Sequence, residues 1–134
     1  MIEYRSFVTE DLEALRTFVS ENGWATRVSD RERFHAMVTS ADRTVVAIDG
    51  DRIVGFARAL CDDVSNGYIS MVVVAEDRRR QSIGRRLVEH IMKDDPENRI
   101  TWVLRAGRGS GAFWQQLGFK SSVIAMERVR QEGQ

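Results

Sequence analysis

The segment VVVAEDRRRQSIGRRLVEHI, residues 72–91, decides the fold. It begins with three consecutive valines, a run that is typical of a strand buried on both faces and therefore central in its sheet. After this strand Ile83, Leu87 and Ile91 recur at helical spacing, which predicts a helix over residues 79–93. A buried strand that leads directly into an amphipathic helix indicates an architecture in which helices cover a sheet.

Three arginines, Arg78, Arg79 and Arg80, stand where this helix is expected to begin. Cations are unfavourable there, because a helix N-terminus exposes N–H groups and carries a partial positive charge. The arginines therefore indicate an anion, such as a pyrophosphate, and the small residues Ser82 and Gly84 would let it approach the backbone. The alternative is a solvated basic helix start in which Gly84 is merely tolerated. The segment has neither G-x-G-x-x-G nor a Walker lysine, which argues against dinucleotide-binding and P-loop sites.

Composition limits the number of domains, the kinds of partner and the cellular location that can be expected. The chain has 134 residues, of which 43% are hydrophobic, and this fits one domain over residues 1–134. Twenty basic and twenty acidic residues cancel, so a basic function must be local and a nucleic-acid partner is disfavoured. Cys61 is the only cysteine, which fits a reducing cytoplasm. No signal peptide and no apolar run of about 20 residues is present, so we expect a cytoplasmic protein without a membrane partner.

The remaining patterns predict a mixed sheet with helices on both faces, of the α/β (α+β) class. Apolar runs and alternation predict strands, including a hairpin at Asp49-Gly50, over residues 2–8, 44–60, 66–76, 99–106 and 119–129. Helical spacing of apolar residues predicts helices over residues 9–23, 29–41, 79–93 and 109–118.

Two motifs make the sequence resemble the GNAT superfamily of N-acyltransferases. Residues 72–91 are similar to its acyl-CoA-binding motif, a strand followed by a turn and by R/Q-x-x-G-x-G/A at the start of a helix. Arg79, Ser82 and Gly84 occupy the fixed positions, with Ser82 in place of the first glycine. GAFWQQLGF, residues 111–119, resembles the C-terminal signature, an aromatic pair followed by x-x-x-G-F. The resemblance implies the GNAT acyl-CoA N-acyltransferase fold, a mixed, mostly antiparallel sheet of six to seven strands with about four helices.

The resemblance also implies that acetyl-CoA is the acyl donor. Main-chain groups of Val72, Val73 and Val74 would pair with its pantetheine arm, beside a β-bulge that separates the strand from its neighbour; the alternative is that these valines serve only the core. The other residues implied at the cofactor are Arg79, Arg80, Gln81, Ser82, Ile83, Gly84, Arg85 and Trp114. Arg85 and Arg86 would either face the 3′-phosphate or be solvated. No spacing of histidine, cysteine and aspartate suggests a metal.

The implied reaction is direct acetyl transfer to an amine, and the expected catalytic residues are only partly present. Trp114 stands where many relatives carry a tyrosine proposed to protonate the leaving sulfur, and Gly107 falls near a frequent asparagine. Tyr68 stands in the place of the usual glutamate base; it is either the catalytic candidate or an aromatic residue packed at the cleft rim. Ser70 shares the face of Tyr68 and could hold a water.

The acceptor would lie against the loop ENGWATRVSD, residues 21–30. Trp24 either caps an acceptor pocket or covers the core, and Arg27 either binds a carboxylate-bearing acceptor or is solvated. We interpret His35 as a structural residue, with a place at the acceptor cleft as the alternative, His90 as a surface residue, and Cys61 as a small residue at a strand end. The predicted function is acetyl-CoA-dependent N-acetyltransfer to a primary amine of a small molecule or peptide, and the alternative is a non-catalytic acyl-CoA-binding module that acts as a sensor or partner subunit. Strand edges near the C-terminus are compatible with a homodimer.

Overall fold

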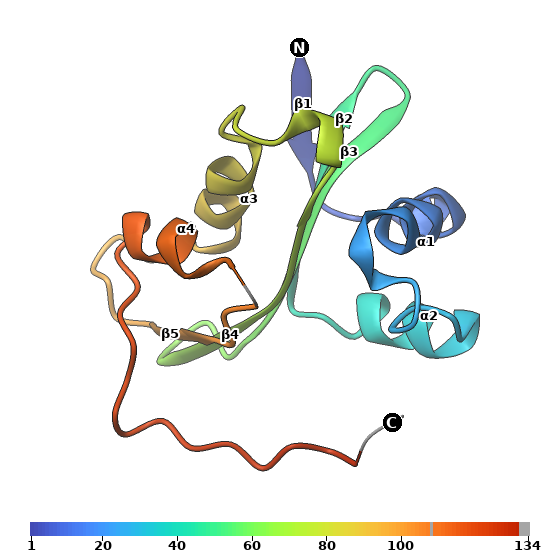
Figure 1. The fold of residues 1–134 in the computed structure, drawn as a ribbon. Helices are drawn as coiled ribbons and strands as arrows, with labels where there is room; N and C mark the ends of the chain where they lie inside the picture. The colour runs from blue at the N-terminus through green and yellow to red at the C-terminus, as the bar shows by residue number, and fades with distance from the viewer. Residues whose placement is uncertain (108, 132–134) are drawn as a thin grey trace.

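The computed structural model describes residues 1–107 and 109–131. Its strands form one twisted sheet in the order β1-β2-β3-β4-β5 (Figure 1). Neighbouring strands are antiparallel except β4 and β5, which are parallel. The strands are β1 (Ile2–Arg5), β2 (Arg43–Asp49), β3 (Arg52–Cys61), β4 (Asn66–Val74) and β5 (Thr101–Leu104). The predicted mixed, mostly antiparallel sheet is therefore confirmed.

Helices cover both faces of this sheet, as predicted. In Figure 1 α1 (Leu12–Val19) and α2 (Arg31–Thr39) lie on one side, and α3 (Ile83–Ile91) and α4 (Gly111–Gln116) lie on the other. A 3₁₀ turn precedes α1 at Thr9–Asp11, a π-helical turn follows it at Ser20–Trp24, and another 3₁₀ turn joins β4 to α3 at Glu76–Arg78. No helix of the described chain is both long and apolar enough to cross a membrane.

The core lies on both faces of the central strand β3. Helix α1 buries Leu15 and Val19 from one side, and α3 buries Leu87 from the other. Gly55 of β3 lets α3 approach closely, because a Cβ atom there would lie 3.0 Å from the Leu87 side chain. The central position predicted for β4 is also confirmed, since β4 has a neighbour on each side.

The strand predicted over residues 119–129 is wrong. The structure places no strand among residues 117–131, and Val123, Ile124 and Met126 are 100%, 86% and 95% exposed. Alternating apolar residues favour a strand only where a neighbouring strand supplies hydrogen bonds, and this segment pairs with none of the strands described. The sheet therefore has five strands instead of six to seven. The tail runs from α4 toward the side of α1 and α2 (Figure 1), and Glu127 forms a 2.9 Å ion pair with Arg105.

Candidate functional site

A gap in the sheet opens where β5 ends and the neighbouring strand β4 continues. The two strands pair from Asn66 opposite Thr101 to Ile69 opposite Leu104, and β4 then continues to Val74 with no described strand on that side. Ser70 is a bulge, because Ile69 pairs with Ala59 and the next pair, Met71 with Arg58, skips it. A bulge bends a strand and increases its twist, which carries the end of β4 away from β5. Main-chain groups on the free edge of β4 are left available to a ligand.

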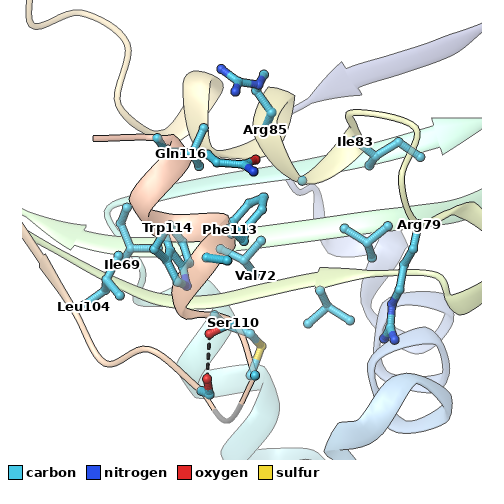
Figure 2. A pocket seen from close by; sticks show the side chains of 18 of the residues that line it. Ile69, Val72, Arg79, Ile83, Arg85, Leu104, Ser110, Phe113, Trp114 and Gln116 are labelled. Carbon is cyan, nitrogen blue, oxygen red and sulfur yellow. Dashed lines mark hydrogen bonds between the residues drawn. The ribbon is translucent and has the colours of Figure 1, made fainter. Parts of the chain in front are cut away.

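A cavity of about 990 Å³ occupies this gap. The end of β4, the start of α3, helix α4 and Trp24 bound it. Figure 2 shows Arg79 at one end of the cavity and Trp114 and Leu104 at the other, with Val72 facing Phe113 between them. The cavity is therefore elongated, basic at the end near Arg79 and mostly apolar at the other end, where Arg105 follows Leu104 in the lining.

The first turn of α3 offers amide groups at the basic end. Arg80 and Ser82 have left-handed backbone angles, with φ of +66° and +65°, and turn the chain sharply into the helix. The first helical hydrogen bond runs from the Arg86 amide to the Ser82 carbonyl at 3.1 Å, so the amides of residues 83–85 have no carbonyl partner within the helix. The first turn contains no acidic residue. The helix start is therefore suited to an anion.

Gly84 is needed for the contact between α3 and α4 beside the cavity. A Cβ atom at this position would lie 3.0 and 3.1 Å from two ring carbons of Phe113 and 3.7 Å from a methyl group of Val74. A larger residue would therefore displace the Phe113 ring, which lines the cavity.

The three arginines before α3 have different roles. Arg78 donates a 2.6 Å hydrogen bond to Asp49 and holds the pKa of that carboxyl below its usual range. Arg79 and Arg80 line the cavity, are exposed, and form no ion pair with another described residue. Arg78 also lines the cavity, but its ion pair with Asp49 leaves Arg79 and Arg80 as the two of these three arginines without an acidic partner in the described chain.

The residues that follow Arg80 also differ in whether they line the cavity. Ile83, Gly84 and Arg85 line the cavity, whereas Gln81 and Arg86 do not. Ile83 is almost fully buried, so its side chain belongs to the core. Arg85 extends away from β4 in Figure 2.

Aromatic packing fixes the apolar end. Trp114 is buried, with its ring centroid 4.9 Å from that of Phe113 and 5.3 Å from that of Phe119, both edge-on. The Ser110 hydroxyl, also at this end, donates a 2.7 Å hydrogen bond to the Gly107 carbonyl (Figure 2). None of the described residues that line the cavity is an aspartate, glutamate, histidine, cysteine or tyrosine. The lining therefore lacks the side chains that usually transfer protons near neutral pH.

The acceptor candidates lie around Ser70. Ser70 and Trp24 line the cavity, whereas Tyr68 is half-buried outside its lining. The guanidinium carbon of Arg27 lies 5.6 Å from the centre of the Trp24 ring, which is a cation–π contact. Arg27 itself is exposed and does not line the cavity.

Arg58 is a residue of this region that was not predicted from the sequence. It donates a 2.6 Å hydrogen bond to the Ser70 hydroxyl. Burial lowers the pKa of Arg58; Tyr68 opposes this shift and Arg27 adds to it. Burial also lowers the pKa of Arg27, and the charges of Arg130 and Arg105 lower it further. These side chains therefore share one positively charged region. The signal in the sequence was a single arginine inside the apolar run VGFARAL.

The other residues considered from the sequence lie away from the cavity. His90 stacks on Tyr4 with 5.2 Å between ring centroids, and His35 is half-buried on α2. The sulfur of Cys61 accepts a 3.3 Å hydrogen bond from the Asp63 amide. Within residues 1–107 and 109–131 no three histidine, cysteine or acidic side chains are grouped so that they could hold a metal ion.

Comparison with known families gives one match, in which the model of the acetyltransferase (GNAT) domain covers residues 40–121. This range includes β2 to α4 and all of the cavity except Asn22 and Trp24. No curated protein sequence matches the chain.

Solved structures agree in fold. A probable acetyltransferase of unknown function from meticillin-resistant Staphylococcus aureus is 20% identical, with a TM-score of 0.82 over 98% of this chain and 99% of its own. The ribosomal-protein-S18-alanine N-acetyltransferase from Escherichia coli is 21% identical, with a TM-score of 0.74 over 92% and 80%. AAC(6')-Iy, solved with the bisubstrate analogue CoA-S-monomethyl-acetylneamine, is 16% identical, with a TM-score of 0.76 over 98% and 99%. At these identities the likeness concerns the fold.

Proposed function

The chain belongs to the GNAT acetyltransferase family, and on this premise we propose that it is an acetyl-CoA-dependent N-acetyltransferase. It would move an acetyl group from the thioester directly to a primary amine of a small molecule or peptide. Bound acetyl-CoA supplies the acetyl group, as a thioester with a good thiolate leaving group. The solved structure of AAC(6')-Iy with a coenzyme A bisubstrate analogue supports this choice of donor.

The observation that carries the proposal is the free edge of β4, which leads from Ser70 to the start of α3. Main-chain groups of Val72, Val73 and Val74 on this edge suit an amide-bearing pantetheine arm, because such an arm can replace the missing strand. The side chains of Val72 and Val74 face α3 and α4. These valines can therefore pack through their side chains while their main-chain groups pair with the pantetheine arm.

The pyrophosphate would lie at the start of α3. Free amides, the helix dipole and two arginines without acidic partners, Arg79 and Arg80, suit a doubly charged group. Gly84 suits the same group, since a Cβ atom there would push Phe113 into the passage. We also assign to the cofactor the backbone of Gln81, Ser82 and Ile83, the side chain of Arg85, and Trp114 at the acyl end.

The amine must lose a proton before it attacks, since an alkylammonium group has a pKa of about 10.4. Tyr68 and Ser70 are the polar side chains on this part of β4, and we propose that Tyr68 takes the proton directly or through a water held by Ser70. Backbone N–H groups on the free edge of β4 are the donors available to the carbonyl oxygen. Trp114 cannot protonate the sulfur, so coenzyme A would leave as a thiolate. The pKa of a thiol, about 8.5, is low enough for the thiolate to leave without prior protonation.

A non-catalytic acyl-CoA-binding module is the second candidate. The buried Trp114 and the lack of acidic, histidine, cysteine and tyrosine side chains in the described cavity lining favour it. Such a module would bind acetyl-CoA as a sensor or partner subunit without turnover.

Release of free thiol from acetyl-CoA, measured with a panel of small amines and short peptides, separates the two functions. An enzyme should release thiol in proportion to amine concentration, and mass spectrometry should find the acetylated amine. Tyr68→Phe should lower kcat with little change in acetyl-CoA affinity. Tight acetyl-CoA binding without acetylation of any amine would instead support the binding module.

We further propose a cytoplasmic location and no nucleic-acid or membrane partner. The single cysteine, the net charge of zero and the supply of acetyl-CoA inside cells support this proposal. A homodimer stays a prediction; the free edge of β5, which pairs only with β4 in the described chain, supports it.

A further inference from the structure

Arg58 is a buried cation in the middle of the central strand β3. Its side chain belongs to a residue only 6% exposed, and it forms one hydrogen bond, to the Ser70 hydroxyl at 2.6 Å. Its Nε atom is buried without a hydrogen-bond partner, and no carboxylate of the described chain forms an ion pair with it. Within the described chain Arg58 is the one polar or charged residue in the buried set.

A buried guanidinium without a counter-ion is costly. The charge loses its hydration, and neither Ser70 nor the surrounding apolar side chains replace it. An apolar residue of similar volume would avoid this cost. The arrangement is therefore that of a site completed by an anion from outside the chain.

The position of Arg58 indicates where that anion would come from. Gly55 faces α3, so alternation along β3 turns Arg58 to the opposite face, the one covered by α1 and α2. Ser70, its hydrogen-bond partner, lines the cavity at the bulge where β4 leaves β5. The guanidinium thus lies directly behind the cavity wall, on the side expected for the acceptor.

A second cation lies on the same side. Arg27 rests on Trp24, whose ring lines the cavity, and it forms no ion pair with a described residue. Burial is the main cause that lowers the pKa values of both Arg58 and Arg27; the charge of Arg27 lowers that of Arg58 further, and Tyr68 opposes both shifts. Arg105, which also lowers the pKa of Arg27, has an acidic partner, Glu127. Arg58 and Arg27 are thus two cations on the same side that form no ion pair with a described carboxylate, and a bound carboxylate would neutralise them.

We propose that the amine acceptor is an amino acid, whose carboxylate binds Arg58 beside Ser70 and is covered from the outside by Arg27. The amine would then point toward the gap between β4 and β5. This inference rests on the proposed acetyltransferase function and adds the class of its second substrate. The competing explanation is that Arg58 only supports the bulge at Ser70.

The test uses pairs of amines in which an amide replaces the carboxylate: glycine with glycinamide, β-alanine with β-alaninamide, and γ-aminobutyrate with its amide. The three chain lengths sample different distances between the amine and the carboxylate. In the native protein we expect kcat/KM for acetylation to be about tenfold or more higher for the carboxylate of at least one pair, as a charged hydrogen bond implies.

Three variants locate the effect. Arg58→Met should abolish the preference while the midpoint of urea unfolding stays equal or rises, because methionine fills the space without a buried charge. Arg58→Lys should keep part of the preference. Arg99→Gln removes one exposed arginine outside the cavity lining and should leave the preference unchanged.

Thermal unfolding in the presence of coenzyme A gives a readout that needs no turnover. At millimolar concentration a carboxylate of the panel should raise the Tm of the native protein, its amide should not, and Arg58→Met should lose the rise. Equal behaviour of acids and amides in both measurements, or a preference that survives in Arg58→Met, would overturn the inference. A Tm rise specific for the acid, without acetylation, would instead support the site and contradict the enzymatic function.

Discussion

Ile69 of β4 lies opposite Leu104 of β5, and this is the last pair that joins the two parallel strands. Beyond it β5 ends, whereas β4 continues through the bulge at Ser70 to Val74. The cavity therefore results from a difference in length between β4 and β5. Its floor is a free strand edge, and its basic end is the start of α3. Predictions about this site can be tested separately from the stability of the fold.

Gly84→Val should abolish acetyl-CoA binding while the domain stays folded. The new side chain would meet Phe113, whose ring carbons lie 3.0 and 3.1 Å from the position of a Cβ atom. Overpacking typically costs about 1–3 kcal/mol, less than the total stability of a domain of about 5–15 kcal/mol. Gly111→Val is the matched control, since no atom lies within 4 Å of a Cβ at Gly111. Calorimetric titration measures the affinity, and unchanged binding by Gly84→Val would contradict the assignment.

Ser82→Gly should stabilise the protein. Ser82 has a φ of +65°, where a side chain costs about 1–2 kcal/mol, and part of this gain is offset by the flexibility of glycine in the unfolded chain. We expect the free energy of unfolding in urea to rise by about 0.5–1 kcal/mol. Ser40→Gly is the control, because Ser40 has a φ of −87° and glycine should there be destabilising. A loss of stability in Ser82→Gly would contradict the left-handed turn.

Arg79→Gln should weaken acetyl-CoA binding without changing stability, whereas Arg78→Gln should lower stability without changing binding. Arg79 lines the cavity without an acidic partner, so its loss should weaken acetyl-CoA binding by about tenfold and leave the urea midpoint unchanged. Arg78 is bonded to Asp49 at 2.6 Å, so its loss should lower the midpoint and leave the affinity nearly unchanged. Equal losses of affinity in both variants would show that the whole arginine cluster binds the anion.

Asp11→Asn tests the pH dependence of stability. Two hydrogen bonds from Arg5, at 2.8 and 2.9 Å, and one from the Val8 amide hold the pKa of Asp11 below its usual range. This stabilisation is present above the pKa in the unfolded chain, about 3.9, and is lost as the pH falls through the lower folded-state value.

Asp11→Asn should therefore lower the free energy of unfolding by about 1.5–3 kcal/mol at neutral pH, and the difference from the native protein should shrink in acid. Glu10→Gln, at the exposed neighbouring residue, should show no such trend. Urea unfolding over a series of pH values measures both, and a difference that is constant with pH would argue against the role of this carboxylate.

The sequence was informative where the signal is local. The valine segment 72–74 of β4, the amphipathic α3 and the small residues Ser82 and Gly84 lie close together in the sequence, so residue type and spacing predict both the elements and the anion site. The structure adds why glycine is usual at position 82, since the backbone there is left-handed.

Features that depend on distant partners could not be predicted. The interaction of Arg78 with Asp49 joins residues 29 positions apart, and that of Arg58 with Ser70 depends on the register between β3 and β4. The alternation over residues 119–129 resembled a strand, but strand formation requires a paired edge, which no local pattern can report.

Calorimetric titration with acetyl-CoA, repeated with dephospho-CoA, tests the central claim most directly. If the gap between β4 and β5 leads a coenzyme A arm to Arg79, Arg80 and the start of α3, acetyl-CoA should bind with a Kd of the order of micromolar. Dephospho-CoA, which keeps the pyrophosphate but lacks the 3′-phosphate, should bind several-fold more weakly because Arg85 loses a charged contact. Absence of binding by either ligand would contradict the account and leave the family likeness as one of fold alone.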